Sequence, residues 1–169
     1  MVLDALGREW QLATPQLDFV QPKRFGLTYK DNEGQDQTPV MIHFALMGSI
    51  ERFLSVYIEH TAGAFPLWLS PVQIAIIPIS EKHLDYAKEV AKQLLNHELR
   101  IMNYDQNETL GKKIRTAEME KIPYLLIMGD KEIEAQAVGV RERGKGDLGS
   151  MALDTFIEKI KREIKTKIS

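Results

Sequence analysis

The chain has 169 residues, a formal net charge of −2 and 44% hydrophobic residues, a composition typical of a globular protein that buries a core. The near-neutral charge excludes RNA binding through a broad basic surface, so any RNA contact must use a local patch. The absence of cysteine excludes disulfides, thiol catalysis and cysteine-based metal sites. Because no apolar run could span a membrane and the first residues do not form a signal peptide, we expect a cytoplasmic protein with no membrane partner.

The first part of the chain reads as strands, a polar hairpin loop and one helix. The predicted strands are 8–14, 16–19 and 38–43, with a short strand or turn at 25–29 and the loop at 30–36. A helix is predicted for 48–61, and the apolar residues that recur along one face, which we expect to be buried, are Ile50, Phe53, Leu54, Tyr57 and Ile58. Two or three strands and one helix cannot enclose a core. We therefore predict that residues 1–65 are the end of a larger domain and that they expose apolar surface able to self-associate.

A linker is predicted at residues 66–71, because Pro66 and Pro71 stop both helix and strand. Strands and helices alternate after it. The predicted strands are 72–77, 100–104, 124–128 and 135–140, and the predicted helices are 81–96, 110–120 and 153–165. This order predicts a self-contained α/β domain with a mixed sheet over residues 72–169.

Arg52 is the most informative residue of the first part. Its permanent cation follows a strand-to-helix turn at Gly48, where a residue without Cβ permits close approach of a ligand such as phosphate. An amphipathic helix with a solvated Arg is the simpler interpretation of this pattern alone. His43 ends the preceding strand and is equally compatible with a structural role. Gln11 and Gln16 are five residues apart and share a face only if the strand is kinked, for which Thr14-Pro15 is the predicted place.

The second part offers a polar loop and a basic edge. Residues 105–111 follow a strand and open a helix, which places Asn107 to meet a polar ligand, although a simple capping loop explains the pattern as well. Residues 129–132 read as a tight turn between strands. Arg141 and Arg143 near the last strand extend a basic edge toward Arg115.

These separate signals match one family. The segments that carry the resemblance are 4–11, 16–19, 39–43, 48–53, 65–73, 129–132 and 146–151. In order and spacing they closely resemble the C-terminal part of threonyl-tRNA synthetases, over essentially the whole chain. The resemblance implies a class II anticodon-binding domain over 72–169, with a mixed five-stranded sheet and three helices. It also implies that residues 1–65 are the remnant of a partial antiparallel-sheet catalytic domain that carries the third class II motif.

Site roles follow from the same resemblance. Arg52 is implied to be a catalytic residue that grips ATP phosphate, since its planar fork matches phosphate oxygens. Gln11 is implied to lie beside the nucleotide and adenylate, and Gln16 and Ser49 to line the threonine pocket. His43 matches one of three protein ligands of a zinc ion that recognises threonine.

The anticodon-contacting positions implied by the resemblance are Asn107, Arg115, Glu132 and Arg141, of types that read exposed base edges. This chain departs from the family at two positions. Phe44 stands where many relatives have Arg, and Thr109 stands where some have Lys. The implied partners are threonine tRNA, threonine and ATP, and the implied parent is a homodimer that uses zinc and ATP-magnesium.

Two hypotheses follow. The first is a fragment of an enzyme that ligates threonine to its tRNA through threonyl-adenylate. We expect such a fragment to be inactive alone and to hold no metal tightly, because the first two motifs and the other zinc ligands would lie upstream. The second is a standalone, non-catalytic module that binds RNA or a protein. A small α/β enzyme with its own site is disfavoured because the sequence offers no nucleophile–base pair.

Overall fold

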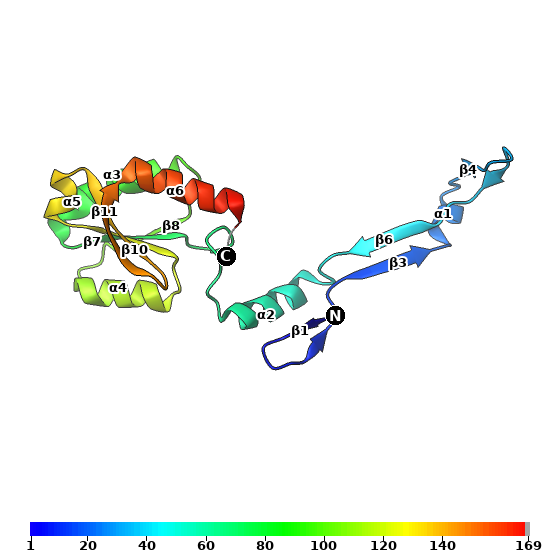
Figure 1. The fold of residues 1–169 in the computed structure, drawn as a ribbon, viewed down its shortest axis with the longest axis horizontal. Helices are drawn as coiled ribbons and strands as arrows, with labels where there is room; N and C mark the ends of the chain where they lie inside the picture. Colours follow the sequence, from blue (N-terminus) through cyan, green and yellow to red (C-terminus); the bar gives the residue numbers. More distant parts are fainter. Residues whose placement is uncertain (168–169) are drawn as a thin grey trace. The chain divides into compact units, whose positions relative to one another are not determined.

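The computed structural model describes residues 1–167, and these divide into two compact units. Unit 1 is Met1–Ala62 and unit 2 begins at Gly63. Each unit is coloured by sequence in Figure 1, with unit 1 in blue to cyan-green shades and unit 2 in green to red. The assignment of 1–65, 66–71 and 72–169 as remnant, linker and anticodon-binding domain stays a prediction.

Unit 1 consists of three antiparallel two-stranded ladders and two helices (Figure 1). Its strands are β1 Val2–Leu3, β2 Glu9–Trp10, β3 Thr14–Asp18, β4 Tyr29–Lys30, β5 Asp36–Gln37 and β6 Met41–Ala45, and its helices are α1 Gln21–Arg24 and α2 Ile50–Thr61. The ladders pair β1 with β2, β3 with β6, and β4 with β5. The predicted hairpin loop is confirmed between β4 and β5, whereas α1 was not predicted.

The apolar stripe of α2 is largely exposed, so the expectation that it is buried is wrong. Ile50, Leu54 and Ile58 are 58%, 44% and 48% exposed, and Val56 is the buried residue of this helix. The ring of Phe53 stacks on that of Tyr57 with centroids 5.7 Å apart. Periodicity predicts which residues share a helix face, but burial of that face needs a second surface, and unit 1 does not supply one.

Unit 2 is built on one five-stranded mixed sheet with strand order β11-β10-β9-β7-β8. Strands β7 Ile74–Pro78, β8 Ile101–Asn103 and β9 Tyr124–Met128 are parallel, and β10 Ala137–Glu142 and β11 Gly146–Ala152 continue the sheet antiparallel. The helical elements are a 3-10 turn at Glu81–His83 and the helices α3 Leu84–Leu95, α4 Leu110–Met119, α5 Asp130–Glu134 and α6 Leu153–Thr166.

Helices cover both faces of this sheet. Helices α3 and α6 lie on one face and α4 lies on the other (Figure 1). Strand β7 shows why: Ile74 and Ile76 point into the cluster with α3 and α6, while Ala75 and Ile77 point toward α4. Alternate residues of a strand face opposite sides, so a strand buried on both faces is continuously apolar.

The predicted five-stranded mixed sheet is confirmed, and so are the three long helices of unit 2. Two details differ. The fifth strand is β11, which the hydrophobic pattern did not mark. Residues 129–132 do not form a tight turn between strands, because Asp130 begins the short helix α5.

Lys113 is buried in unit 2 with only 3% of its surface exposed. It lies on α4, and its Nζ donates a hydrogen bond to the carbonyl oxygen of Pro78 at 3.0 Å. A buried ammonium is tolerated only when it is hydrogen-bonded. Lys113 therefore ties α4 to the carboxyl end of β7.

Candidate functional site

The turn that precedes α2 gathers three of the predicted site residues of unit 1. Gly48 has a left-handed φ of +63°, and a Cβ added to it would lie 2.9 Å from the backbone oxygen of Leu12, so a glycine is required. Ser49 caps α2, because its Oγ accepts a hydrogen bond from the backbone N–H of Arg52 at 3.1 Å. The Arg52 side chain is exposed and donates to the backbone oxygen of Gln11 at 3.2 Å. Gln11, Ser49 and Arg52 therefore lie together.

Gln11 lies in a break between β2 and β3, and its Nε2 donates to the Thr14 hydroxyl at 2.7 Å. The interruption therefore precedes Thr14, and the predicted kink at Thr14-Pro15 is wrong because β3 runs through both residues. Gln16 on β3 is the direct cross-strand partner of His43 on β6, so their side chains share one face of the ladder.

His43 is half-buried and has a carboxylate partner that the sequence analysis missed. Its Nε2 lies 3.0 Å from Oδ2 of Asp18, two residues beyond Gln16 on the same strand. Hydrogen bonds from the backbone N–H groups of Gln21 and Val20, and then that from His43, lower the pKa of Asp18. Within residues 1–167 no group of three His, Asp or Glu side chains gathers to hold a metal. His43 and Asp18 together fall short of the three protein ligands of a catalytic zinc site.

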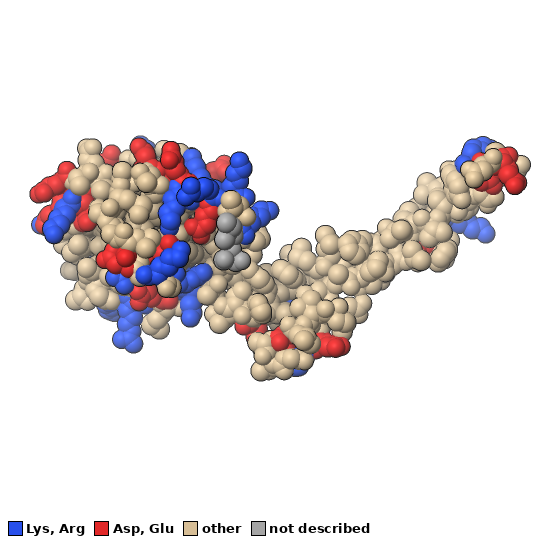
Figure 2. All heavy atoms as spheres, in the orientation of Figure 1, with Lys and Arg blue, Asp and Glu red and all other residues tan. Residues whose placement is uncertain are grey.

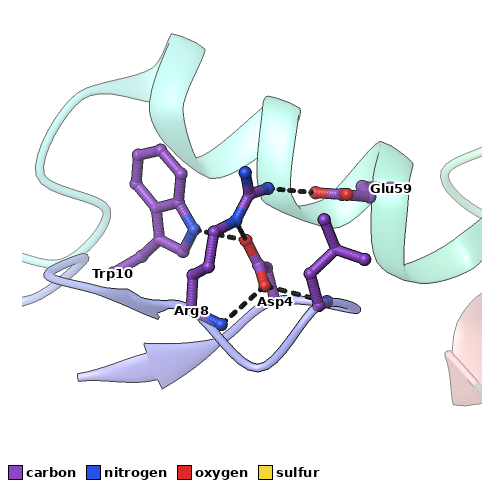
Figure 3. Close-up of polar contacts among 5 residues, drawn as sticks. Asp4, Arg8, Trp10 and Glu59 are labelled. Atoms are coloured by element: carbon purple, nitrogen blue, oxygen red, sulfur yellow. Dashed lines mark hydrogen bonds and ion pairs between the residues drawn. The ribbon is translucent and has the colours of Figure 1, made fainter.

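A second polar cluster of unit 1, also missed from sequence, surrounds the buried Asp4 (Figure 3). Its carboxylate accepts hydrogen bonds from the backbone N–H groups of Leu6 and Arg8, from Nε of Arg8 at 2.6 Å and from Nε1 of Trp10 at 2.8 Å. Burial opposes ionisation, but these bonds, led by that of the Trp10 indole, lower the pKa of Asp4 far below its ordinary value. Arg8 also reaches Glu59 on α2 at 3.5 Å, which joins the β1–β2 hairpin to that helix. The Asp4-x-x-x-Arg8-x-Trp10 spacing across a glycine turn was the available signal.

In unit 2, Glu132 and Arg141 lie on the α4-facing side of the sheet. Gly139 and Arg141 pair with Ile127 and Leu125 of β9, both of which belong to the α4 cluster. A Cβ built on Gly139 would lie 3.6 Å from Oε1 of Glu132, so the Glu132 carboxylate is above β10, on the face that Gly139 shares with Arg141. Its other oxygen, Oε2, accepts a hydrogen bond from the backbone N–H of Gly129 at 3.0 Å.

The guanidinium of Arg141 is incompletely satisfied. One terminal nitrogen lies 3.6 Å from Oε1 of Glu118 on α4, while its buried Nε has no hydrogen-bond partner within residues 1–167. Arg115 is exposed on α4, one turn before Glu118. The structure thus brings Arg115, Glu132 and Arg141 to the same side of unit 2.

Asn107 lies at the carboxyl edge of the sheet, in the loop between β8 and α4. It lines a pocket of about 460 Å³ formed by residues 79–82, Leu84, residues 105–108 and Lys113. The cap of α4 is Thr109, whose hydroxyl accepts from the backbone N–H of Lys112, so the Asn107 side chain is not needed for capping. Glu132 follows β9 and therefore belongs to the same edge as Asn107.

The charges of unit 2 are interspersed. Figure 2 shows Lys and Arg side chains mixed with Asp and Glu over the face in view, without a large patch of one sign. Among residues 1–167 no helix combines the length and the apolar character that crossing a membrane requires.

Comparison with known proteins matches both units to one class. The family described as anticodon binding domain matches residues 73–163, and the tRNA synthetase class II core domain (G, H, P, S and T) matches residues 1–61. The chain therefore belongs to the anticodon binding domain family, and both matches are to parts of class II aminoacyl-tRNA synthetases.

Individual relatives indicate which synthetase family the chain resembles. The threonine–tRNA ligase of Carboxydothermus hydrogenoformans is 54% identical over 97% of this chain and 26% of its own length, and that of Acidobacterium capsulatum is 55% identical over 98% and 24%. The solved RNA binding domain of threonyl-tRNA synthetase from Cryptosporidium parvum Iowa II has a TM-score of 0.86 at 38% identity, covering 95% of this chain and 41% of that one. The chain therefore belongs to the threonyl-tRNA synthetase family, and it spans about a quarter of the length of these curated relatives.

Proposed function

We propose that this chain is part of a threonine–tRNA ligase and that residues 72–169 read the anticodon of threonine tRNA. Residues 1–65 then carry the third motif of the class II catalytic domain, and residues 66–71 join the two. The family matches and the arrangement of Glu132 and Arg141 support this proposal.

The observation that carries the anticodon assignment is the buried, unpartnered Nε of Arg141. A buried donor without an acceptor is destabilising by about 1–3 kcal/mol, a cost that a bound ligand can offset. Glu132 lies over the same face of β10, with Oε1 free of hydrogen bonds to residues 1–167. A guanidinium donates and a carboxylate accepts, so the pair is suited to the hydrogen-bonding edges of unstacked bases. Arg115 and Asn107 extend this surface on α4 and on the loop before it.

In unit 1, Arg52 is proposed to bind ATP phosphate. Its exposed guanidinium has only the backbone oxygen of Gln11 as a partner among the described residues, so it keeps donors for phosphate oxygens. Gln11 is proposed to lie beside the bound nucleotide, which the contact of its backbone oxygen with Arg52 supports. Gln16 and Ser49 are proposed to line the threonine pocket.

Zinc and ATP-magnesium are assigned to the whole ligase rather than to this chain alone. His43 is proposed to be one ligand of the zinc, but it and Asp18 do not complete a site within residues 1–167. The proposed partners of the whole enzyme are threonine, ATP, threonine tRNA and a second subunit.

The test is binding of the full chain to the anticodon stem-loop of threonine tRNA. We expect weak, salt-sensitive binding that Arg141→Ala and Glu132→Ala each weaken by about 1–3 kcal/mol, or roughly 5- to 150-fold. Arg162→Ala on the exposed face of α6 is the matched control and should leave affinity within twofold. Unchanged binding by both site variants would refute the anticodon assignment.

A second measurement tests the dependence of catalysis on residues outside this chain. The pure chain should give no ATP–pyrophosphate exchange with threonine, and measurable exchange would contradict this. The alternative, a standalone RNA- or protein-binding module, predicts stem-loop binding that does not depend on the anticodon bases.

A further inference from the structure

His83 is a buried histidine whose two ring nitrogens both have partners. It ends the 3-10 turn after β7 and is 2% exposed. Its Nδ1 accepts a hydrogen bond from the backbone N–H of Ser80 at 3.0 Å, and its Nε2 lies 3.2 Å from Oδ1 of Asp130. Because Nδ1 accepts, the ring proton belongs on Nε2, which donates to Asp130. His83 therefore connects the loop after β7 to the first residue of α5.

Other contacts hold the same two loops together. Lys82 Nζ donates to Oδ2 of Asp130 at 2.8 Å, and the backbone N–H of Ile79 donates to the carbonyl of Met128 at 3.0 Å. A Cβ on Gly129 would lie 2.6 Å from Cδ1 of Ile79, so the loops are in close contact. Hydrogen bonds from Lys82 and His83 lower the pKa of Asp130, which keeps this carboxylate ionised.

The position of α5 determines where the Glu132 carboxylate points. This helix has five residues, too few to be stable without external contacts. His83 and Lys82 anchor its first residue, Asp130, and the backbone N–H of Gly129 fixes Oε2 of Glu132. The remaining oxygen, Oε1, is the one turned toward β10.

We propose that His83 is a positioning residue for anticodon reading: through Asp130 it holds α5 so that Glu132 presents Oε1 to a base. This inference rests on the proposed function of Glu132. Both ring nitrogens of His83 already have hydrogen-bond partners within unit 2, so neither is available to RNA. The role of His83 is therefore to orient Glu132 and not to contact the base.

Two conservative variants separate the two hydrogen bonds of His83. His83→Asn keeps an acceptor close to the position of Nδ1 but cannot reach Asp130, whereas His83→Gln places an amide N–H near the position of Nε2. The readout is the specificity ratio, which is the dissociation constant for stem-loops with one anticodon base changed divided by that for the threonine anticodon stem-loop. Loss of one hydrogen bond of about 1 kcal/mol predicts that His83→Asn lowers this ratio about fivefold, while His83→Gln keeps it within twofold. The exposed His97→Asn is the matched control and should keep the ratio.

The double variant His83→Asn/Glu132→Ala distinguishes the possible failures. If His83 acts through Glu132, the double variant has the ratio of Glu132→Ala alone. An unchanged ratio in Glu132→Ala would refute the proposed role of Glu132. A lowered ratio there, with an unchanged ratio in His83→Asn, would refute positioning by His83 while leaving the proposed function intact. Equal losses in the Asn and Gln variants would exclude the route through Asp130.

Asp130→Asn tests the same link from the exposed side, should a His83 variant fail to fold. Its side chain is 65% exposed, so the substitution should not disturb the core. An amide weakens both the Lys82 and the His83 contacts, and we expect the ratio to fall about two- to fivefold. A ratio equal to wild type, in a chain with unchanged far-UV circular dichroism, would overturn the proposal.

Discussion

Unit 2 encloses apolar clusters on both faces of one sheet, whereas unit 1 buries only three apolar residues of its own, Leu12, Pro22 and Val56. Unit 1 instead relies on ladders of two strands and on polar clusters such as that of Asp4. Isolated two-stranded ladders are marginally stable in water, while a sheet covered by helices on both faces is independently stable. The difference shows that regular backbone geometry and a stabilising core are separate properties, even within one chain.

The largest expected effect is on the stability of unit 2. Phe156 is fully buried on α6, and Phe156→Ala should lower the free energy of unfolding by about 3–5 kcal/mol through cavity formation. Phe44 on β6 is 60% exposed, and Phe44→Ala should change it by less than about 0.5 kcal/mol. Urea unfolding followed by circular dichroism measures both. Similar losses would mean that unit 1 has a core of its own.

The next largest expected effect is on self-association through unit 1. The exposed apolar residues of unit 1 include Leu17, Ile42 and Leu54, and unpaired strand edges accompany them. We expect concentration-dependent dimers or larger species in size-exclusion chromatography with light scattering. Ile42→Glu should shift the population toward monomer, whereas a glutamate introduced on unit 2 by Lys161→Glu should not. A strictly monomeric wild-type chain would contradict the expectation.

The smallest expected effect is local and depends on pH. The pKa of Asp4 is lower in the folded hairpin than in an unfolded chain, so its stabilisation is complete above the ordinary Asp pKa of about 3.9 and is lost as pH falls toward the folded value. The indole N–H resonance of Trp10 should therefore keep its position through pH 5 and change only in more acidic solution. Asp4→Asn should abolish this acid transition. A transition centred at the ordinary value in the wild-type chain would show that the cluster does not form.

The elements of unit 2 were largely predictable because their strands are continuously apolar and their helices carry apolar residues at helical spacing. Strand β11 was not, since Gly146 and Gly149 interrupt any alternation and both have positive φ. It is a strand because β10 pairs with it, which is a tertiary property. The one-turn helix α5 was missed for a similar reason, as its polar residues suit a turn equally well until Asp130 is anchored.

The candidate site was predictable only as single residues. The sequence marked Arg52, His43 and Arg141, but not the contacts that they make. Arg52 meets Gln11 across 41 positions, and His43 meets Asp18 across 25. Such distant pairs are fixed by strand pairing and turn geometry and leave no periodic signal. The resemblance to a family supplied the proposed roles of these residues.

The burial of Lys113 has a practical consequence for following the folding of unit 2. Its neighbour Lys112 is exposed, so the two adjacent amines should differ in their rate of acylation by a water-soluble reagent. Lys112 should be modified at once, while Lys113 should be modified only when α4 separates from the end of β7. The extent of acylation of Lys113 relative to that of Lys112, measured by mass spectrometry, would report how often α4 separates from the sheet.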